Sequence, residues 1–241
     1  MGGICDCCLG SNSVQSNPLH DEVPLRNDQF PLSQTSDESA TIHLPSLHVS
    51  ANLGQDSSSE RKKIYIITAP HSTCPPSHTS STGHPCDSEA GSNAELLHKL
   101  LDHSLLYRKP LSERAKGDLN RHETWNDPWR VKLRELVQSS TCEGVIDVHG
   151  FPPESSQYDY YFISQDPNAE FENFLSRYVY QQCAEVGIYG PEQALKGLEN
   201  SIMIDALQFK SKVILIEIRE GLSDYKKRKL LEALAQGVKK F

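Results

Sequence analysis

The segment at residues 69–89, APHSTCPPSHTSSTGHPCDSE, contains three histidines, two cysteines, an aspartate and a glutamate. Imidazole, thiolate and carboxylate groups are the ligands that zinc takes in proteins. The segment therefore predicts a zinc site. Two kinds of site are open: a structural zinc loop that is complete in itself, or one half of a catalytic site whose other half lies further along the chain.

A structural loop would use Cys74, His78, His84 and Cys86, with the spacing C-x3-H-x5-H-x-C. Structural zinc sites usually place paired ligands two to four residues apart, and the last pair here is closer than that. We therefore favour a catalytic site, with the structural zinc module kept as an alternative.

Three apolar segments typical of buried strands end in residues that could form the other half. His71 follows the segment 64–69, His149 lies at the end of 144–150, and Glu217 lies near the end of 213–218. Packing gives a buried strand no reason to end in such residues. The types fit a zinc hydrolase in which His71 and His149 bind the metal, Asp147 orients a ligand and Glu217 takes a proton from water.

The elements that must position these residues follow from hydrophobic periodicity. A further strand is expected at 158–164, and helices are expected at 92–106, 169–186 and 224–240. Another helix is expected to begin at Asn126-Asp127-Pro128. Strands that alternate with helices predict an α/β domain with a mostly parallel sheet covered on both faces. In such sheets, ligands bind at the carboxyl ends of the strands.

The order of several short motifs resembles the N-formylglutamate amidohydrolase family, and through it the zinc carboxypeptidase and aspartoacylase fold. The resemblance runs from about residue 63 to 241. The motifs are Pro70-His71-Ser72, Glu89-Ala90-Gly91, Asp118-Leu119-Asn120-Arg121, Asn126-Asp127-Pro128, Asp147-Val148-His149-Gly150 and Ile216-Glu217-Ile218-Arg219. The implied fold is a three-layer αβα domain around a mostly parallel, mixed sheet.

The resemblance also implies the metal ligands. His71 is the first zinc ligand and His149 the last, and the middle ligand is an acidic residue between them. Glu89 is the first choice, because Glu89-Ala90-Gly91 best matches the family's Asp-x-Gly pattern. Asp87 is the alternative to Glu89, and Cys74 is a third possibility.

The implied reaction is hydrolysis of an amide bond in a small carboxylate-bearing substrate, such as an N-formyl or N-acyl amino acid or a peptide end. Glu217 corresponds to the general base that assists the attacking water. Arg121, with Asn120, corresponds to the pair that holds the substrate carboxylate, a task that suits the planar fork of a guanidinium. The other open interpretation is an inactive relative that serves as a membrane-tethered binding or scaffold protein.

Residues 1–60 differ from the rest of the chain. They carry a net charge of −7 out of −8 for the whole sequence, and they are rich in Ser, Asn, Asp and Pro. Such a segment buries too little apolar surface to offset the entropy of ordering, so we expect a disordered tail before a catalytic domain at 61–241. Its first residues, MGGICDCC, resemble acylated N-termini, with myristate on Gly2 and palmitate on Cys5, Cys7 and Cys8. Two lipid signals would attach the chain peripherally to a membrane.

Charge and cysteine content restrict the class of protein further. Residues 61–241 are close to neutral, which argues against nucleic acid as a partner. The sequence has no apolar run as long as the roughly 18 residues of a membrane span, and an odd, scattered set of cysteines fits reduced thiols in the cytoplasm.

Overall fold

The computed structural model describes residues 49–51, 63–72, 87–109, 118–165, 169–196, 200–210 and 212–241. The predicted acylation sites Gly2, Cys5, Cys7 and Cys8 lie outside these ranges, and so do the cysteines and histidines of the alternative structural zinc loop, Cys74, His78, His84 and Cys86. Among the helices described, none is long and apolar enough to cross a bilayer.

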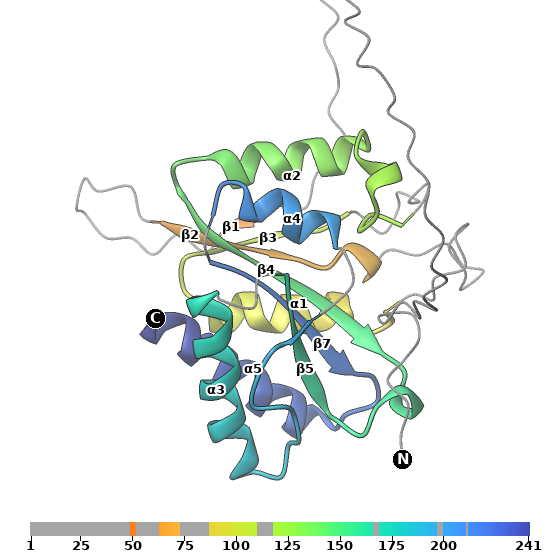
Figure 1. Cartoon of the computed structure of the whole chain (residues 1–241), viewed down its shortest axis with the longest axis vertical. Helices are drawn as coiled ribbons and strands as arrows, with labels where there is room; N and C mark the ends of the chain where they lie inside the picture. Colours follow the sequence, from red (N-terminus) through yellow and green to blue (C-terminus); the bar gives the residue numbers. More distant parts are fainter. Residues whose placement is uncertain are drawn as a thin grey trace, which may run out of the picture. The chain divides into compact units, whose positions relative to one another are not determined.

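The described strands form one mixed sheet with the order β1-β3-β2-β4-β7-β5-β6 (Figure 1). The central strands β3, β2, β4 and β7 are parallel, β1 and β5 run antiparallel to their inner neighbours, and β6 is parallel to β5. The strands are β1 Val49–Ala51, β2 Ile64–Thr68, β3 Ser104–Tyr107, β4 Cys142–Phe151, β5 Tyr160–Ser164, β6 Leu195–Lys196 and β7 Lys212–Arg219. Strand β1 falls inside the 1–60 segment, for which the sequence predicts no regular structure.

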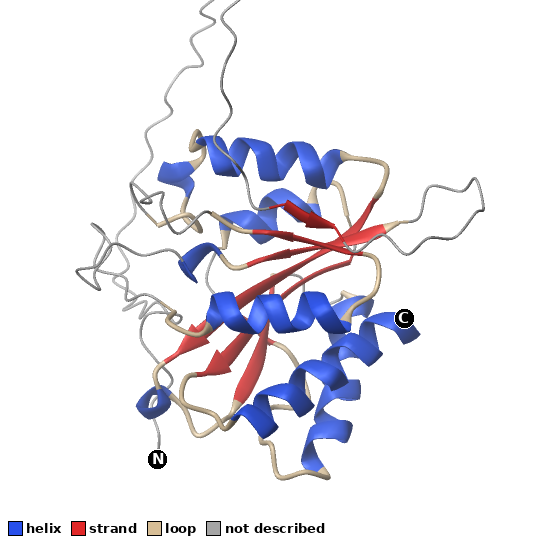
Figure 2. Cartoon of the chain, turned by 180° about the vertical axis from the view of Figure 1, so that it is seen from behind, coloured by secondary structure: helices blue, strands red, loops and turns tan. Residues whose placement is uncertain are grey.

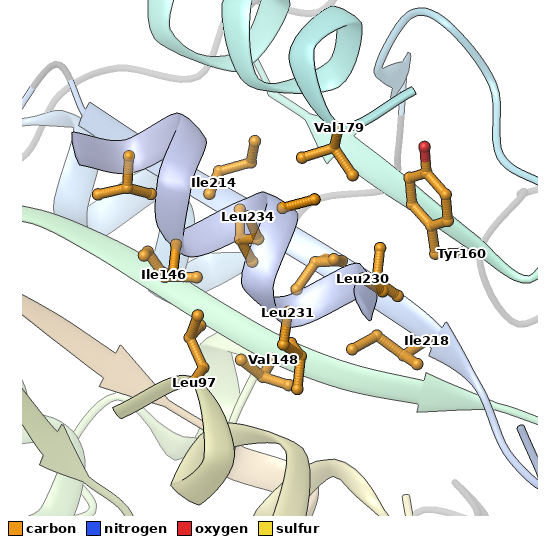
Figure 3. Packing of buried hydrophobic residues seen from close by; sticks show 14 of the residues in the cluster. Leu97, Ile146, Val148, Tyr160, Val179, Ile214, Ile218, Leu230, Leu231 and Leu234 are labelled. Atoms are coloured by element: carbon orange, nitrogen blue, oxygen red, sulfur yellow. The ribbon is translucent and has the colours of Figure 1, made fainter. Parts of the chain in front are cut away.

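Helices cover both faces of the sheet, as Figures 1 and 2 show. The helices are α1 Ala90–Leu100, α2 Pro128–Gln138, α3 Glu170–Ala184, α4 Ser201–Leu207 and α5 Asp224–Lys240. One core lies between the sheet and α1, α3 and α5, and Figure 3 shows Leu97, Val179 and Leu231 of these helices packed there. The second core lies under α2 and α4, and includes Trp129 and Met203. The predicted three-layer αβα architecture with a mostly parallel, mixed sheet is thus confirmed.

Local sequence signals fix where several helices begin. The Asp127 side chain accepts a hydrogen bond from Trp129 N, and Pro128 occupies the first turn of α2, where its missing N–H is not needed. Ser223 caps α5 and Asn200 caps α4 in the same way. The α2 start was predicted from these residue types, whereas the short helix α4 was not.

The helix predicted at 92–106 extends too far, because its last residues form a strand instead. Helix α1 ends at Leu100, and Ser104–Tyr107 forms β3, so Leu105 belongs to the sheet. The chain reverses at His103, whose φ of 58° is left-handed, and the Ser104 hydroxyl donates to Leu101 O at 2.8 Å. The leucine spacing continues across this turn because both the helix and the strand bury leucines.

A buried ion pair joins the two helices on one face to the loop before α2. Arg130 of α2 is fully buried and donates to Asp205 of α4 at 2.6 Å. Its guanidinium also donates to the carbonyl oxygens of Leu119 and Arg121 at 2.6 and 3.2 Å. Arg130 therefore connects α2 and α4 to the segment 118–121.

We expect Arg130→Met to lower the free energy of unfolding by about 3–5 kcal/mol, because it leaves the buried Asp205 carboxylate with only the more distant Arg134, at 3.9 Å, as an ion-pair partner. Urea denaturation followed by circular dichroism measures the change. The matched control is Lys132→Met, which breaks the exposed Lys132–Glu135 pair and should cost less than about 1 kcal/mol. Equal losses in the two variants would contradict the prediction.

Candidate metal centre

Three parallel strands bring chemically active side chains to one edge of the sheet. His71 lies in the 3-10 turn Pro70–Ser72 directly after β2, a turn closed by the Ser72 hydroxyl, which donates to Ala69 O at 2.7 Å. His149 lies near the end of β4, and Glu217 is its neighbour in register on β7. Residues paired in register project to the same face, so His149 and Glu217 share the face that α2 and α4 cover.

His71, Asp87 and His149 form a compact cluster of ligand atoms. One potential ligand atom from each residue lies within 4.8 Å of the others. Asp87 Oδ2 lies 3.3 Å from His71 Nδ1 and 3.2 Å from His149 Nδ1. The two imidazole rings are perpendicular, with centroids 4.6 Å apart. Two imidazole nitrogens and one carboxylate oxygen match the three protein ligands of catalytic zinc sites.

The other nitrogen of each imidazole contacts an acidic side chain. His71 Nε2 lies 2.7 Å from Asp118 Oδ1, and His149 Nε2 lies 3.1 Å from Asp147 Oδ2. The amide nitrogen of Asn120 also lies 2.8 Å from His149 Nε2. A hydrogen on Nε2 that donates to a carboxylate leaves Nδ1 as the ligand atom, and such carboxylate–histidine pairs accompany most metal-binding histidines. At His149 this tautomer requires the Asn120 amide to turn its oxygen, rather than its nitrogen, towards Nε2. The donor set and its surroundings therefore fit zinc.

Asp147 is itself held from two sides. The Thr68 hydroxyl of β2 donates to Asp147 Oδ1 at 2.6 Å, and the Asn200 side chain donates to Oδ2 at 3.3 Å. Burial alone would raise the pKa of Asp147, but the charge of His149 and the hydrogen bonds with His149 and Thr68 hold that pKa below its usual value. Asp147 is therefore a carboxylate whose position relative to His149 is fixed by β2, β4 and the start of α4.

The metal-free cluster favours protonated histidines. Burial alone would lower the pKa of His71, but hydrogen bonds to Asp118 and Asp87 outweigh it and raise that pKa to about 9. The pKa of His149 is also raised well above its usual value, chiefly by Asp147. The same contacts hold the pKa of Asp87 far below its usual range, against the effect of burial. A metal ion would replace the protons that lie between these groups.

Glu217 is the buried acid beside the cluster. Burial raises its pKa to about 8, and the charges of Asp87 and Asp147 add to the rise, while His149 and His71 act in the opposite direction. Its Oε2 is buried without a hydrogen-bond partner among the described residues. A carboxyl group with a pKa near neutral pH and an uncommitted oxygen is suited to exchange protons with a water or substrate.

The structure places the two acidic residues that were expected as the middle ligand differently. Asp87 lies in the cluster, whereas Glu89 does not. The Glu89 carboxylate instead forms an ion pair with Lys227 at 3.0 Å and accepts from Gly221 N at 3.2 Å. Glu89 precedes α1 by one residue, and its contacts place it at the turn after β7.

The structure places the Asp118–Arg121 motif against the two histidines. Asn120, predicted to hold substrate, is buried against His149, and Asp118, given no role from sequence, is the partner of His71. The only sequence signal for Asp118 was its place in the Asp118-Leu119-Asn120-Arg121 motif. Arg121 donates from Nε to Asp118 Oδ2 at 3.2 Å, and 38% of its side chain is exposed, so its guanidinium is accessible beside the cluster.

Comparisons with known proteins give structural likeness only. No protein-family profile matches the sequence, and no curated protein matches it. Tripeptide-bound Cell Shape Determinant protein Csd4 from Helicobacter pylori superposes with a TM-score of 0.52 at 12% identity, covering 80% of this chain and 56% of Csd4. Its product-bound form gives 0.51, with 80% and 55% covered. N-acetylmuramoyl-L-alanine amidase from Clostridium difficile 630 gives 0.46 at 12% identity, with 74% and 96% covered.

The chain thus shares the fold of Csd4, which is described as a D,L-carboxypeptidase, and spans about half its length. This agrees with the carboxypeptidase-like fold that the sequence motifs predict. At this level of identity the likeness concerns the fold, and it does not single out N-formylglutamate amidohydrolases.

We expect zinc to bind the metal-free protein more tightly as pH rises from about 6 to 9. Zinc needs deprotonated Nδ1 atoms, and His71 with a pKa of about 9 holds its proton below that pH. Each proton released should strengthen binding up to about ten-fold per pH unit. Chelator competition at constant ionic strength measures the affinity, and calorimetry in buffers of different ionisation heat measures the protons released.

The control is His122→Gln, which alters an exposed histidine outside the cluster and should show the same pH dependence as the wild type. An affinity that stays constant between pH 6 and 9 would mean that these imidazoles are not the ligands.

Proposed function

We propose that this chain is a zinc-dependent hydrolase that cleaves an amide bond in a small carboxylate-bearing substrate. The observation that carries the proposal is the contact of Asp87 with both His71 and His149, next to the buried acid Glu217. The fold shared with a D,L-carboxypeptidase agrees with it. N-formyl and N-acyl amino acids and peptide ends are the substrate class that we infer, because the sequence motifs resemble those of N-formylglutamate amidohydrolases.

His71, Asp87 and His149 would hold the metal through Nδ1, Oδ2 and Nδ1. Zinc bound there would supply a Lewis acid that polarises a carbonyl group and lowers the pKa of water to about 7. Asp118 and Asp147 fix the two imidazole rings and their tautomers through Nε2. Their hydrogen bonds also raise the basicity of the ligand nitrogens.

Glu217 is the residue that we propose to move the proton. Its uncommitted Oε2 accepts a proton from the attacking water as the water oxygen bonds to the substrate carbonyl carbon. The same carboxyl group then delivers that proton to the amine as the carbon–nitrogen bond breaks. Burial raises the pKa of Glu217 in the metal-free protein, and the positive charge of a bound zinc would lower it towards the range in which the carboxylate accepts a proton near neutral pH.

Arg121 is the residue that we propose to bind the substrate carboxylate. Its ion pair with Asp118 fixes the Nε side of the guanidinium, and the partly exposed side chain lies one residue from Asn120, which contacts His149. A fixed guanidinium offers two parallel N–H donors, which match the two oxygens of a carboxylate.

Glu217→Gln is expected to reduce kcat by roughly 10²–10⁴-fold, because the amide cannot accept the proton. Zinc content should stay near that of the wild type. The assay uses zinc-loaded full-length protein and a panel of N-acyl amino acids and short peptides, with metal content measured by atomic emission. Glu154→Gln, an exposed glutamate outside the cluster, is the matched control and should be fully active.

Loss of zinc from Glu217→Gln would make Glu217 a ligand rather than a base. Wild-type protein that binds zinc but turns over no member of the panel would favour the inactive binding or scaffold relative. Zinc that is retained in both His71→Ala and His149→Ala would place the metal elsewhere, as in the structural zinc loop.

Arg121→Lys is expected to raise KM by about 10–100-fold while kcat changes little, because lysine keeps the charge but loses the two-pronged hydrogen bond, which is worth roughly 1.5–3 kcal/mol. Steady-state kinetics of a substrate and its carboxamide analogue measure the effect. The variant should lose the wild type's preference for the free carboxylate, whereas Arg228→Lys on the exposed face of α5 should keep it. An unchanged preference would remove Arg121 from substrate recognition.

A further inference from the structure

The residues that precede α1 are tied to the turn that follows β7. Ser88 donates from both its backbone N and its hydroxyl to Glu220 Oε1, at 2.6 and 2.9 Å. In the opposite direction, Gly221 N donates to Glu89 Oε2 at 3.2 Å. Hydrogen bonds thus run both ways between residues 88–89 and 220–221, and these four residues are called the 88–221 clamp below.

The turn side of the clamp is held firmly to the sheet. Glu220 directly follows β7, and its N donates to Phe151 O at the end of β4 at 2.9 Å. Gly221 has a φ of +76°, which favours glycine and lets the chain turn here towards α5. Because β4 and β7 also carry His149 and Glu217, the turn has a fixed position relative to both.

Asp87 lies close to the backbone of Gly150 in β4, as Glu220 of the clamp does. A side chain at Gly150 would stand 3.4 Å from Asp87 Cβ and 3.5 Å from Glu220 Cγ, so both residues approach the β4 backbone where no side chain intervenes. Ala90 N donates to Asp87 O at 3.3 Å, which links Asp87 to the first turn of α1. Asp87 therefore lies between the metal cluster on one side and the clamp on the other.

Glu89 gives a second, independent sign that the clamp has a purpose. It is the N-cap residue of α1, yet its side chain makes no capping hydrogen bond to that helix. Its carboxylate is used on Gly221 N and on Lys227 of α5 instead. A capping hydrogen bond usually stabilises a helix by about 0.5–2 kcal/mol. Helix α1 lacks this stabilisation from Glu89, whose carboxylate binds the turn at Gly221 instead.

We propose that the 88–221 clamp is a positioning device for Asp87, which holds its carboxylate between the two histidines and thereby sets the affinity of the metal site. This rests on the proposed zinc site at His71, Asp87 and His149. Glu220 and Glu89 contact no metal ligand atom; they act through the backbone of residues 87–89. Residues that orient a metal ligand from outside typically change affinity by about 10–100-fold when removed.

The test compares Glu220→Ala with Glu220→Gln in the full-length protein, using zinc alone as the probe. Glu220→Ala removes the acceptor of both Ser88 hydrogen bonds and should raise the zinc Kd by about ten-fold or more. Glu220→Gln keeps an acceptor oxygen without the charge, and should restore the Kd to within about three-fold of the wild type. Chelator competition measures the Kd.

Two further measurements separate positioning from general stability. Cobalt at saturating concentration should give a visible absorption spectrum in Glu220→Ala that differs from the wild type, because the Asp87 oxygen is displaced, whereas Glu220→Gln should retain the wild-type spectrum. The matched control is Glu232→Ala, which removes an acidic residue of α5 that pairs with Arg228 and Lys229 of the same helix, and should leave both Kd and spectrum unchanged.

An unchanged Kd and spectrum in Glu220→Ala would overturn the inference and leave the proposed zinc site intact. Equal weakening in the alanine and glutamine variants would also overturn it, because the effect would then be one of charge. Wild-type protein that binds no zinc would overturn the proposed function and the inference together, and that result is distinguishable because it precedes any variant.

Discussion

The contact of one carboxylate with two imidazoles is the constraint on which the site depends. Asp87 lies within 3.3 Å of both His71 Nδ1 and His149 Nδ1, and all three residues are withdrawn from water. Burying ionised groups is unfavourable unless each is paired, so the surrounding structure must supply partners. Asp118 and Asp147 do so at the two Nε2 atoms, and Glu217 keeps a raised pKa beside them. The cluster is stable only as a complete set, with protons or a metal ion between its acids and bases.

The fold provides that set from elements distant in sequence. The carboxyl ends of β2, β4 and β7 lie side by side because the strands are parallel, and this brings residues 71, 149 and 217 to one edge. The residues that hold the two histidines from outside the cluster come from the face of the sheet that α2 and α4 cover. Arg130 links α2 to α4 through Asp205, and its hydrogen bonds to the 118–121 segment hold the residues that contact the two histidines. Fold stability and site geometry therefore share the same buried contacts.

Much of the architecture was predictable because it follows from local pattern. The strands at residues 64–68 and 212–219 are apolar runs, and α2 begins with an aspartate cap and a proline. The predicted helix at 92–106 was wrong in its last turn, since leucine spacing continues from α1 into β3 and nothing in the pattern marks the reversal at His103. Strands β1 and β6 and helix α4 were not predicted, because short elements carry few residues from which a period can be detected.

The sequence by itself determined which residue types stand at the strand ends, since an apolar strand that ends in His or Glu is visible without a structure. Only the tertiary structure decided which acid completes the cluster. Asp87 and Glu89 are two residues apart at the start of one helix, and sequence spacing favours Glu89. The turn at residues 220–221 binds Glu89 and Ser88, and this leaves Asp87 facing the histidines. That outcome depends on a contact between segments 132 residues apart, which no local pattern encodes.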